Sequence, residues 1–116
     1  MKSISIVPIK WFALILLLNP FFSLAQINAG SVVMNNQAEV DAFDYEEVVG
    51  TVLIQNGPTD LSPLIKLKKA GRLILKNLPV TSLNGLDSLQ VIGDDLQISR
   101  CGNLTDINAL SQLESV

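Results

Sequence analysis

Three segments of the chain carry aliphatic residues at every third position. The series are Leu61, Leu64, Leu67 and Ala70; Leu83, Leu86, Leu89 and Ile92; and Ile107, Leu110, Leu113 and Val116. Side chains three residues apart line up on one side of a 3₁₀-like turn. The spacing therefore predicts three tight turns, each of which buries one row of aliphatic side chains.

A short alternating segment precedes each of these series. The segments are Val52-Leu53-Ile54, Leu73-Ile74-Leu75 and Leu96-Gln97-Ile98, and they begin 21 and then 23 residues apart. We interpret each as a β-strand whose first and third side chains point inward and whose middle side chain points outward. The interval is close to the period of leucine-rich repeats, in which near-identical coils stack on one another.

The predicted fold is mainly β with one short helix. We expect a right-handed β-helix or leucine-rich-repeat-like solenoid of about three coils, spanning residues 50–70, 71–92 and 93–116, with an open C-terminal end. Gly50, Gly71 and Gly93 fall at the turn into each strand, where a positive φ or a close backbone approach favours glycine. Because the last coil ends at Val116 without a polar closing segment, we expect further repeats or domains to follow it.

A capping pattern precedes the first coil. Asn36 can accept a hydrogen bond from a backbone amide of a following helix while Glu39 reaches back, and Val40 and Phe43 follow at helical spacing. The pattern predicts a helix over residues 37–44 that covers the N-terminal end of the stack, because terminal repeats need a polar outer face.

Residues 1–25 have the composition of a secretory signal peptide. Lys2 and Lys10 give a basic start, an apolar run follows, and Ser23 and Ala25 are the small residues that a cleavage site needs. The alternative is an uncleaved membrane anchor, but the apolar run is far shorter than the ~20 residues of a spanning helix. We therefore expect an exported chain with no stable membrane span after cleavage, a flexible lead-in at 26–35 and the solenoid at 36–116.

Charge and composition narrow the range of functions. Removal of Lys2 and Lys10 would leave six basic and eleven acidic residues, so the formal net charge would fall from −3 to −5. This acidity argues against nucleic acid, whose phosphates require clustered Lys and Arg. The chain contains no histidine, so Ser–His and Cys–His catalytic pairs cannot form. We predict no enzyme activity, no catalytic residue and no cofactor.

Acidic pairs and the single cysteine have ordinary explanations. Glu46-Glu47 and Asp94-Asp95 are expected to send adjacent side chains to opposite faces of a strand as solvated charge. One such pair is weak evidence for Ca²⁺, which takes six to eight oxygen ligands, so we predict no metal site. Cys101 is expected to fill the interior as a small buried thiol, with an intermolecular disulfide as the alternative.

The surface best suited to binding is the outward side of the strands. Aligning the coils gives three columns: Thr51, Arg72 and Asp95; Leu53, Ile74 and Gln97; Gln55, Lys76 and Ser99. The neighbouring Leu53 and Ile74 would form a small apolar patch among polar groups. Cross-strand packing without any partner is the alternative explanation. The candidate partner-binding residues are Leu53, Ile74, Gln97, Arg72 and Lys76.

The run from Gln37 to Val116 resembles the bacterial relatives of the receptor L domain, a leucine-rich β-helical module. Residues 37–43 read Q-A-E-V-D-A-F, which is the typical sequence of the helix in that family. The G-x-L-x-I strand pattern is carried by residues 71–75, and the L-x-x-L-x-x-L-x-x-I-G series by residues 83–93. The first coil departs from the pattern at Ala70, and the third has Asp94-Asp95 where a further glycine is usual. The resemblance implies an exported, cell-surface protein of a bacterium.

These observations predict a recognition module at the cell surface or outside the cell, associated with the outer membrane or secreted. Its partner would be a protein or a carbohydrate, and the strand face has no aromatic platform that would distinguish the two. The alternatives are a structural spacer that displays another domain and an inactive fragment of a larger multidomain surface protein.

Overall fold

The computed structural model describes residues 26–115, so the predicted signal peptide and Val116 lie outside the described residues. The strands are β1 (Ile27–Asn28), β2 (Val32–Met34), β3 (Glu47–Gln55), β4 (Lys69–Lys76), β5 (Val91–Ile92) and β6 (Leu96–Ser99). The helical segments are α2 (Gln37–Asp41) and the 3₁₀ turns η2 (Ser62–Leu64) and η3 (Asn108–Gln112). The described chain is therefore mainly β with little helix, as predicted.

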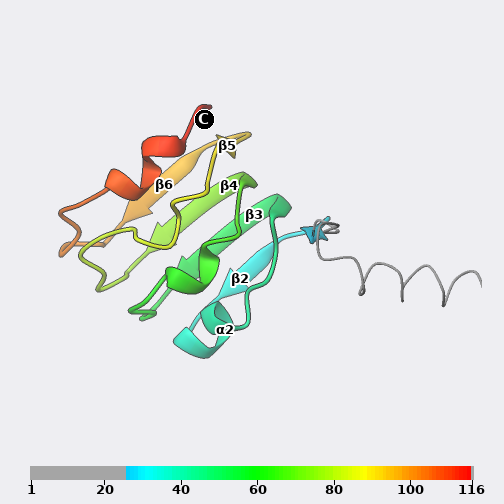
Figure 1. Cartoon of the computed structure of the whole chain (residues 1–116). Helices are drawn as coiled ribbons and strands as arrows, with labels where there is room; N and C mark the ends of the chain where they lie inside the picture. The colour runs from blue at the N-terminus through cyan, green and yellow to red at the C-terminus, as the bar shows by residue number, and fades with distance from the viewer. Residues whose placement is uncertain (1–25, 116) are drawn as a thin grey trace, which may run out of the picture.

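All six strands belong to one open sheet, and each pairing between them is parallel. β3 pairs with β1, β2 and β4, and β4 pairs in turn with β5 and β6. Figure 1 shows β2, β3, β4 and β6 side by side and pointing the same way. In register, Val52 lies between Val32 and Leu73, and Leu73 lies between Val52 and Leu96. The offset of 20 to 23 residues between neighbouring strands agrees with the period of the sequence pattern.

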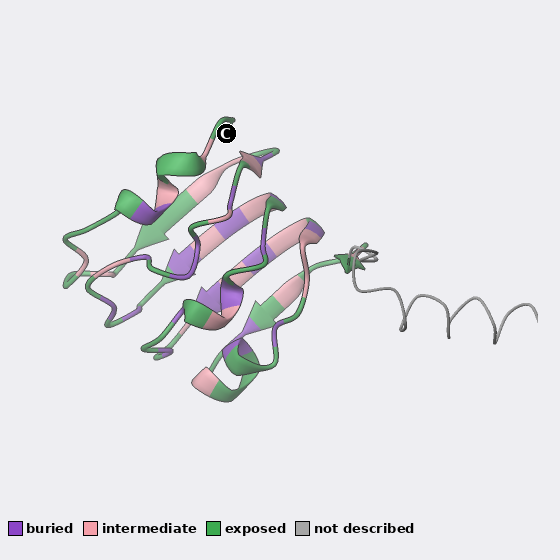
Figure 2. Cartoon of the chain, viewed as in Figure 1, coloured by how far each residue is buried: buried purple, intermediate pink, exposed green. Residues whose placement is uncertain are grey.

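The core is one continuous layer of aliphatic side chains between the strands and the segments that connect them. The predicted inward residues of β3 and β4, namely Val52, Ile54, Leu73 and Leu75, are fully buried. So are the series residues Leu64, Leu67, Leu86, Leu89 and Ile92. Figure 2 shows buried residues concentrated on β3, β4 and their connections. Full burial of one such side chain contributes about 1.5–3 kcal/mol, so this layer is the main source of stability.

The connecting segments form the three-residue turns that the spacing predicts. Backbone amides bond to carbonyls three residues earlier from Leu64 to Leu61 (2.9 Å), from Leu86 to Leu83 (3.1 Å) and from Leu110 to Ile107 (3.0 Å). Short polar side chains start two of these turns, because the Asp60 and Asp106 carboxylates accept from the amides of Ser62 and Asn108 at 2.9 and 2.8 Å. These bonds explain why an aspartate directly precedes Leu61 and Ile107 in the sequence.

Gly50 and Gly71 lie inside β3 and β4, and not at the turn into each strand as predicted. Close backbone approach, and not a positive φ, accounts for these two glycines. A Cβ on Gly71 would lie 2.2 Å from the Val49 carbonyl oxygen, and a Cβ on Gly50 would lie 2.7 Å from the Gly30 oxygen. Gly93 is different, since the nearest atom to its Cβ would be 3.8 Å away. The register between β3 and β4 shifts at this point, between Val48 and Thr51, so the bulge brings the neighbouring backbones together.

The N-terminal part differs from the prediction. Residues 26–35 contain β1 and β2, which pair with β3, where the sequence predicted a flexible lead-in. These strands are only two and three residues long, so their own sequence shows no strand alternation and they depend on pairing with β3. The helix is also shorter than the predicted 37–44, since α2 ends at Asp41.

The capping of α2 follows the predicted pattern. The Asn36 side chain accepts from the Glu39 amide at 2.9 Å, and the Glu39 carboxylate accepts from the Asn35 amide at 2.7 Å. The helix connects β2 to β3 and packs against β2 and η2. It therefore lies beside η2, the turn that connects β3 to β4, on the N-terminal side of the stacked segments (Figure 1).

Burial decreases toward the C-terminal side of the sheet. Ile98 of β6 is 38% exposed and Ile107 is 56% exposed, whereas the equivalent Leu75 and Leu83 are buried. Leu110 and Leu113 pack against the core but remain half-buried. Figure 2 shows the same change as exposed residues over β6 and η3. In the described chain no further strand covers this side of β6.

Candidate binding surface

The strand register brings together the residues that the sequence aligned in columns. Leu53 is the Cα partner of Ile74, and Ile74 is the partner of Gln97. Gln55 pairs in the same way with Lys76, and Lys76 with Ser99. Leu53 and Ile74 are half-buried and alternate with fully buried neighbours, so their side chains lie on the side of the sheet away from the core.

The apolar column is longer than the sequence indicated. Val33 of β2 is the Cα partner of Leu53, and its side chain is 49% exposed. Val33, Leu53 and Ile74 therefore form a row of three aliphatic residues on adjacent strands, which we call the aliphatic row. Residues 32–34 are all apolar, so the sequence contains no alternation that would identify Val33 as the outward-facing residue of a strand.

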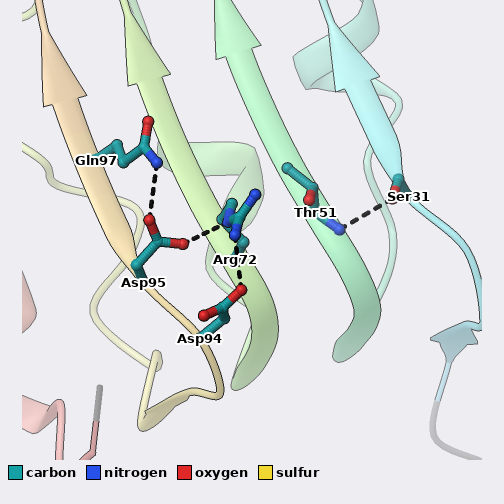
Figure 3. A network of polar contacts seen from close by, with 6 residues as sticks. All are labelled: Ser31, Thr51, Arg72, Asp94, Asp95 and Gln97. Carbon is teal, nitrogen blue, oxygen red and sulfur yellow. Dashed lines mark hydrogen bonds and ion pairs between the residues drawn. The ribbon is translucent and has the colours of Figure 1, made fainter.

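Arg72 organises the polar side chains on one flank of the aliphatic row (Figure 3). Its Nη2 donates to Asp94 Oδ2 at 2.7 Å, and its Nε donates to Asp95 Oδ1. Gln97 Nε2 donates to the other Asp95 oxygen at 2.7 Å. The two carboxylates thus meet one guanidinium, contrary to the prediction that they face opposite ways, because Asp94 lies in a bend before β6.

These contacts favour the charged forms of both Asp95 and Arg72. The hydrogen bond from Gln97, together with the hydrogen bond and positive charge of Arg72, lowers the pKa of Asp95 below its ordinary value of 3.8. Asp95 and Asp94 raise the pKa of Arg72 in return. Both groups are therefore charged at neutral pH, and their charges are largely balanced by one another.

The opposite flank carries amides and one cation. Gln55 Nε2 donates to Asn35 Oδ1 at 2.8 Å, which links β3 to the residue after β2. Lys76 at the end of β4 is exposed, and the ion pairs of residues 26–115 do not include it. The aliphatic row is thus bordered by a neutralised ionic cluster on one side and by a free cation with neutral amides on the other.

Two further lysines pair with acids, whereas Lys69 and Arg100 take part in none of the ion pairs formed within residues 26–115. Lys66 bonds to Asp44, and Lys68 Nζ lies 3.6 Å from Glu46 Oε1. Each pair joins residues 22 positions apart, so each cation balances an acid of the preceding segment.

Cys101 lies next to the core, half-buried. Its Sγ is 3.3 Å from the Ser99 carbonyl oxygen and 3.8 Å from that of Leu75, so the thiol directs its weak donor at backbone acceptors. It forms no disulfide in the described chain. Among residues 26–115 no group of three or more potential metal-ligating side chains comes together, and no helix there is long and apolar enough to cross a bilayer.

Comparison with known proteins adds no relative. No protein-family model matches the chain, and no match is found among curated proteins or solved structures.

Proposed function

We propose that the chain is an exported recognition module that binds a protein or glycan partner through the outward side of its sheet, without catalysis. The parallel strands and their returning turns are interpreted as coils of a right-handed leucine-rich-repeat-like solenoid of the receptor L-domain type. The similar offset of 20 to 23 residues between neighbouring strands and the repeated three-residue turns support this interpretation.

The aliphatic row carries the proposal. Neighbouring strands lie about 4.8 Å apart, so Val33, Leu53 and Ile74 form a strip about 10 Å long. Polar side chains border it on both sides, and a contiguous apolar patch with a polar rim is typical of interaction sites. Cross-strand packing alone would also favour aliphatic residues here, but it does not require them to remain accessible to solvent.

The chemistry of the surrounding groups fits binding better than reaction. The carboxylates next to the row are already bonded to Arg72 and Gln97, and a chain without histidine lacks the usual proton carrier near neutral pH. The free Lys76 at the rim supplies a cation that can select an acidic or hydrogen-bonding partner. The leader-like composition of residues 1–25 supports export to the cell surface or the exterior.

The test compares a double substitution in the row with a matched double substitution elsewhere. Leu53→Ser/Ile74→Ser removes the apolar strip, whereas Ile65→Ser/Ile107→Ser removes two exposed aliphatics, 49% and 56% accessible, from the turns. Each variant is first checked for wild-type circular dichroism and then used as bait on envelope extract from the producing organism.

We expect wild type and the control variant to retain the same partner and the row variant to lose it by at least about tenfold. Equal capture by all three proteins would exclude the strand face and would leave a structural spacer as the better description.

A further inference from the structure

A second feature, separate from the aliphatic row, lies where the strands end. Asn56, Asn77 and Arg100 are the residues that directly follow β3, β4 and β6. All three have left-handed backbone conformations, with φ of 61°, 56° and 54°. The parallel pairing continues through them, since the Asn56 amide bonds to the Lys76 carbonyl at 3.3 Å and the Asn77 amide bonds to the Ser99 carbonyl at 2.9 Å. The strand ends therefore present these three residues as a column.

A hollow of about 520 Å³ opens beside this column. Its polar lining consists of Asn56, Asn77, Arg100 and Asn103, with Gly57 and Gly102 between them. The volume lies in the range of about 300–1,000 Å³ that is typical of small-molecule sites. Loops at one end of a rigid sheet are also where binding residues are commonly placed.

The charge of the hollow differs from that of the chain as a whole. Its lining includes one guanidinium and no carboxylate. Arg100 takes part in none of the ion pairs formed within residues 26–115, in contrast to Arg72, Lys66 and Lys68. A cation that lacks an internal acid, on a chain of net negative charge, is available to an external anion.

The backbone of Arg100 is itself unusual. Asparagine is enriched in the left-handed region because its short side chain tolerates it, and Asn56 and Asn77 follow this rule. A long, unbranched arginine at the third equivalent position does not, and its exposed side chain gains no packing in return. Strain of this kind is often retained for function.

The fold does not explain why residue 102 is a glycine. It is not among the glycines with positive φ, and a Cβ at this position would meet no atom within 4 Å. Neither backbone conformation nor crowding therefore requires glycine here. Gly102 belongs to the lining of the hollow, so the absence of a side chain there leaves this part of the lining uncovered.

We propose that this hollow binds a carboxylate-bearing sugar, with Arg100 holding the carboxylate and the side-chain amides of Asn56, Asn77 and Asn103 holding hydroxyl groups. A guanidinium matches a carboxylate through two parallel hydrogen bonds. Each amide both donates and accepts, as a sugar hydroxyl does. Asn77 and Asn56 are joined only by a long 3.3 Å bond, so both retain capacity for a ligand.

The test is a titration of the intact protein with D-glucuronate, followed by amide NMR. Three further probes separate the possible sources of binding: D-glucose lacks the charge, acetate lacks the hydroxyls, and inorganic phosphate is an unrelated anion. The variants are Arg100→Asn, which restores the residue of the other two positions, Arg100→Lys, which keeps the charge, and Lys66→Gln as a control that removes a distant cation.

We expect glucuronate to shift the side-chain signals of Asn56, Asn77 and Asn103 saturably and to bind at least about tenfold tighter than the other three probes. Arg100→Asn should weaken glucuronate by about tenfold or more, Arg100→Lys by less, and Lys66→Gln not at all. Absence of saturable shifts, equal binding of acetate, phosphate or glucose, or wild-type affinity in a folded Arg100→Asn variant would overturn the proposal. Binding to the aliphatic row is measured with other variants, so either proposal can fail alone.

Discussion

Two glycines at equivalent positions provide a sharp test of how the strands pack. A Cβ on Gly71 would lie 2.2 Å from the Val49 carbonyl oxygen and 2.6 Å from that of Gly50, and both distances are far shorter than an ordinary van der Waals contact. The same atom on Gly93 would have its nearest neighbour, the Gly71 oxygen, at 3.8 Å. The substitution Gly→Ala is chemically identical at both sites, so the two results differ only through the neighbouring backbone.

The magnitude follows from two opposing effects. Forcing a methyl group against a fixed backbone costs about 1–3 kcal/mol, occasionally more. Replacing glycine by alanine also restricts the unfolded chain, which stabilises by about 0.4–1 kcal/mol where the backbone is compatible. Gly71→Ala should therefore lose about 1–2 kcal/mol, whereas Gly93→Ala should be neutral or gain a few tenths of a kcal/mol. For about 90 structured residues, the loss corresponds to a decrease in Tm of roughly 5–15 °C.

Thermal and urea unfolding followed by circular dichroism measures both variants against wild type. An unchanged m-value would show that the difference belongs to the folded state and not to the unfolded chain. Equal stability of Gly71→Ala and Gly93→Ala would refute the close approach of β3 and β4 at the bulge, and with it the strand register on which the proposed binding surface depends.

Two further predictions concern the core and the ionic cluster. Leu86→Ala, at a fully buried site, should lower the free energy of unfolding by about 2–5 kcal/mol in urea titrations, whereas Ile107→Ala, 56% exposed, should cost well under half as much; similar losses would contradict the assigned interior. The lowered pKa of Asp95 contributes stability above pH 3.8 that is lost as the pH falls through the lower folded-state pKa. Carboxyl NMR should show Gln97→Ala raising the Asp95 pKa toward 3.8, and an unchanged value would mean that Gln97 does not hold this carboxylate.

The spacing of aliphatic residues predicted the interior well because a residue's place in a turn or strand decides which side its side chain lies on. In a three-residue turn, Leu83, Leu86 and Leu89 must share one side, and the structure buries all three. The outward pairing of Leu53 with Ile74 followed in the same way from strand alternation and the repeat offset.

Features that arise from contacts between distant segments could not be predicted from the sequence. β2 is a strand because β3 is beside it, so Val33 was not recognised as part of the aliphatic row. Asp94 and Asp95 meet at Arg72 because the chain bends before β6, which strand alternation cannot anticipate. The left-handed residues Asn56 and Asn77 could have been found in the sequence, because an asparagine directly follows each of two strands and the two asparagines are 21 residues apart.

The most direct test of the central claim is site-specific photo-crosslinking in the producing cells. A benzophenone side chain replaces Leu53 in the aliphatic row in one variant and Ile65 in a connecting turn in the other, where the native residue is 49% exposed. The account predicts one discrete crosslinked species from position 53 and none from position 65. Crosslinking from position 65 alone, or from neither position, would contradict recognition through the outward side of the sheet.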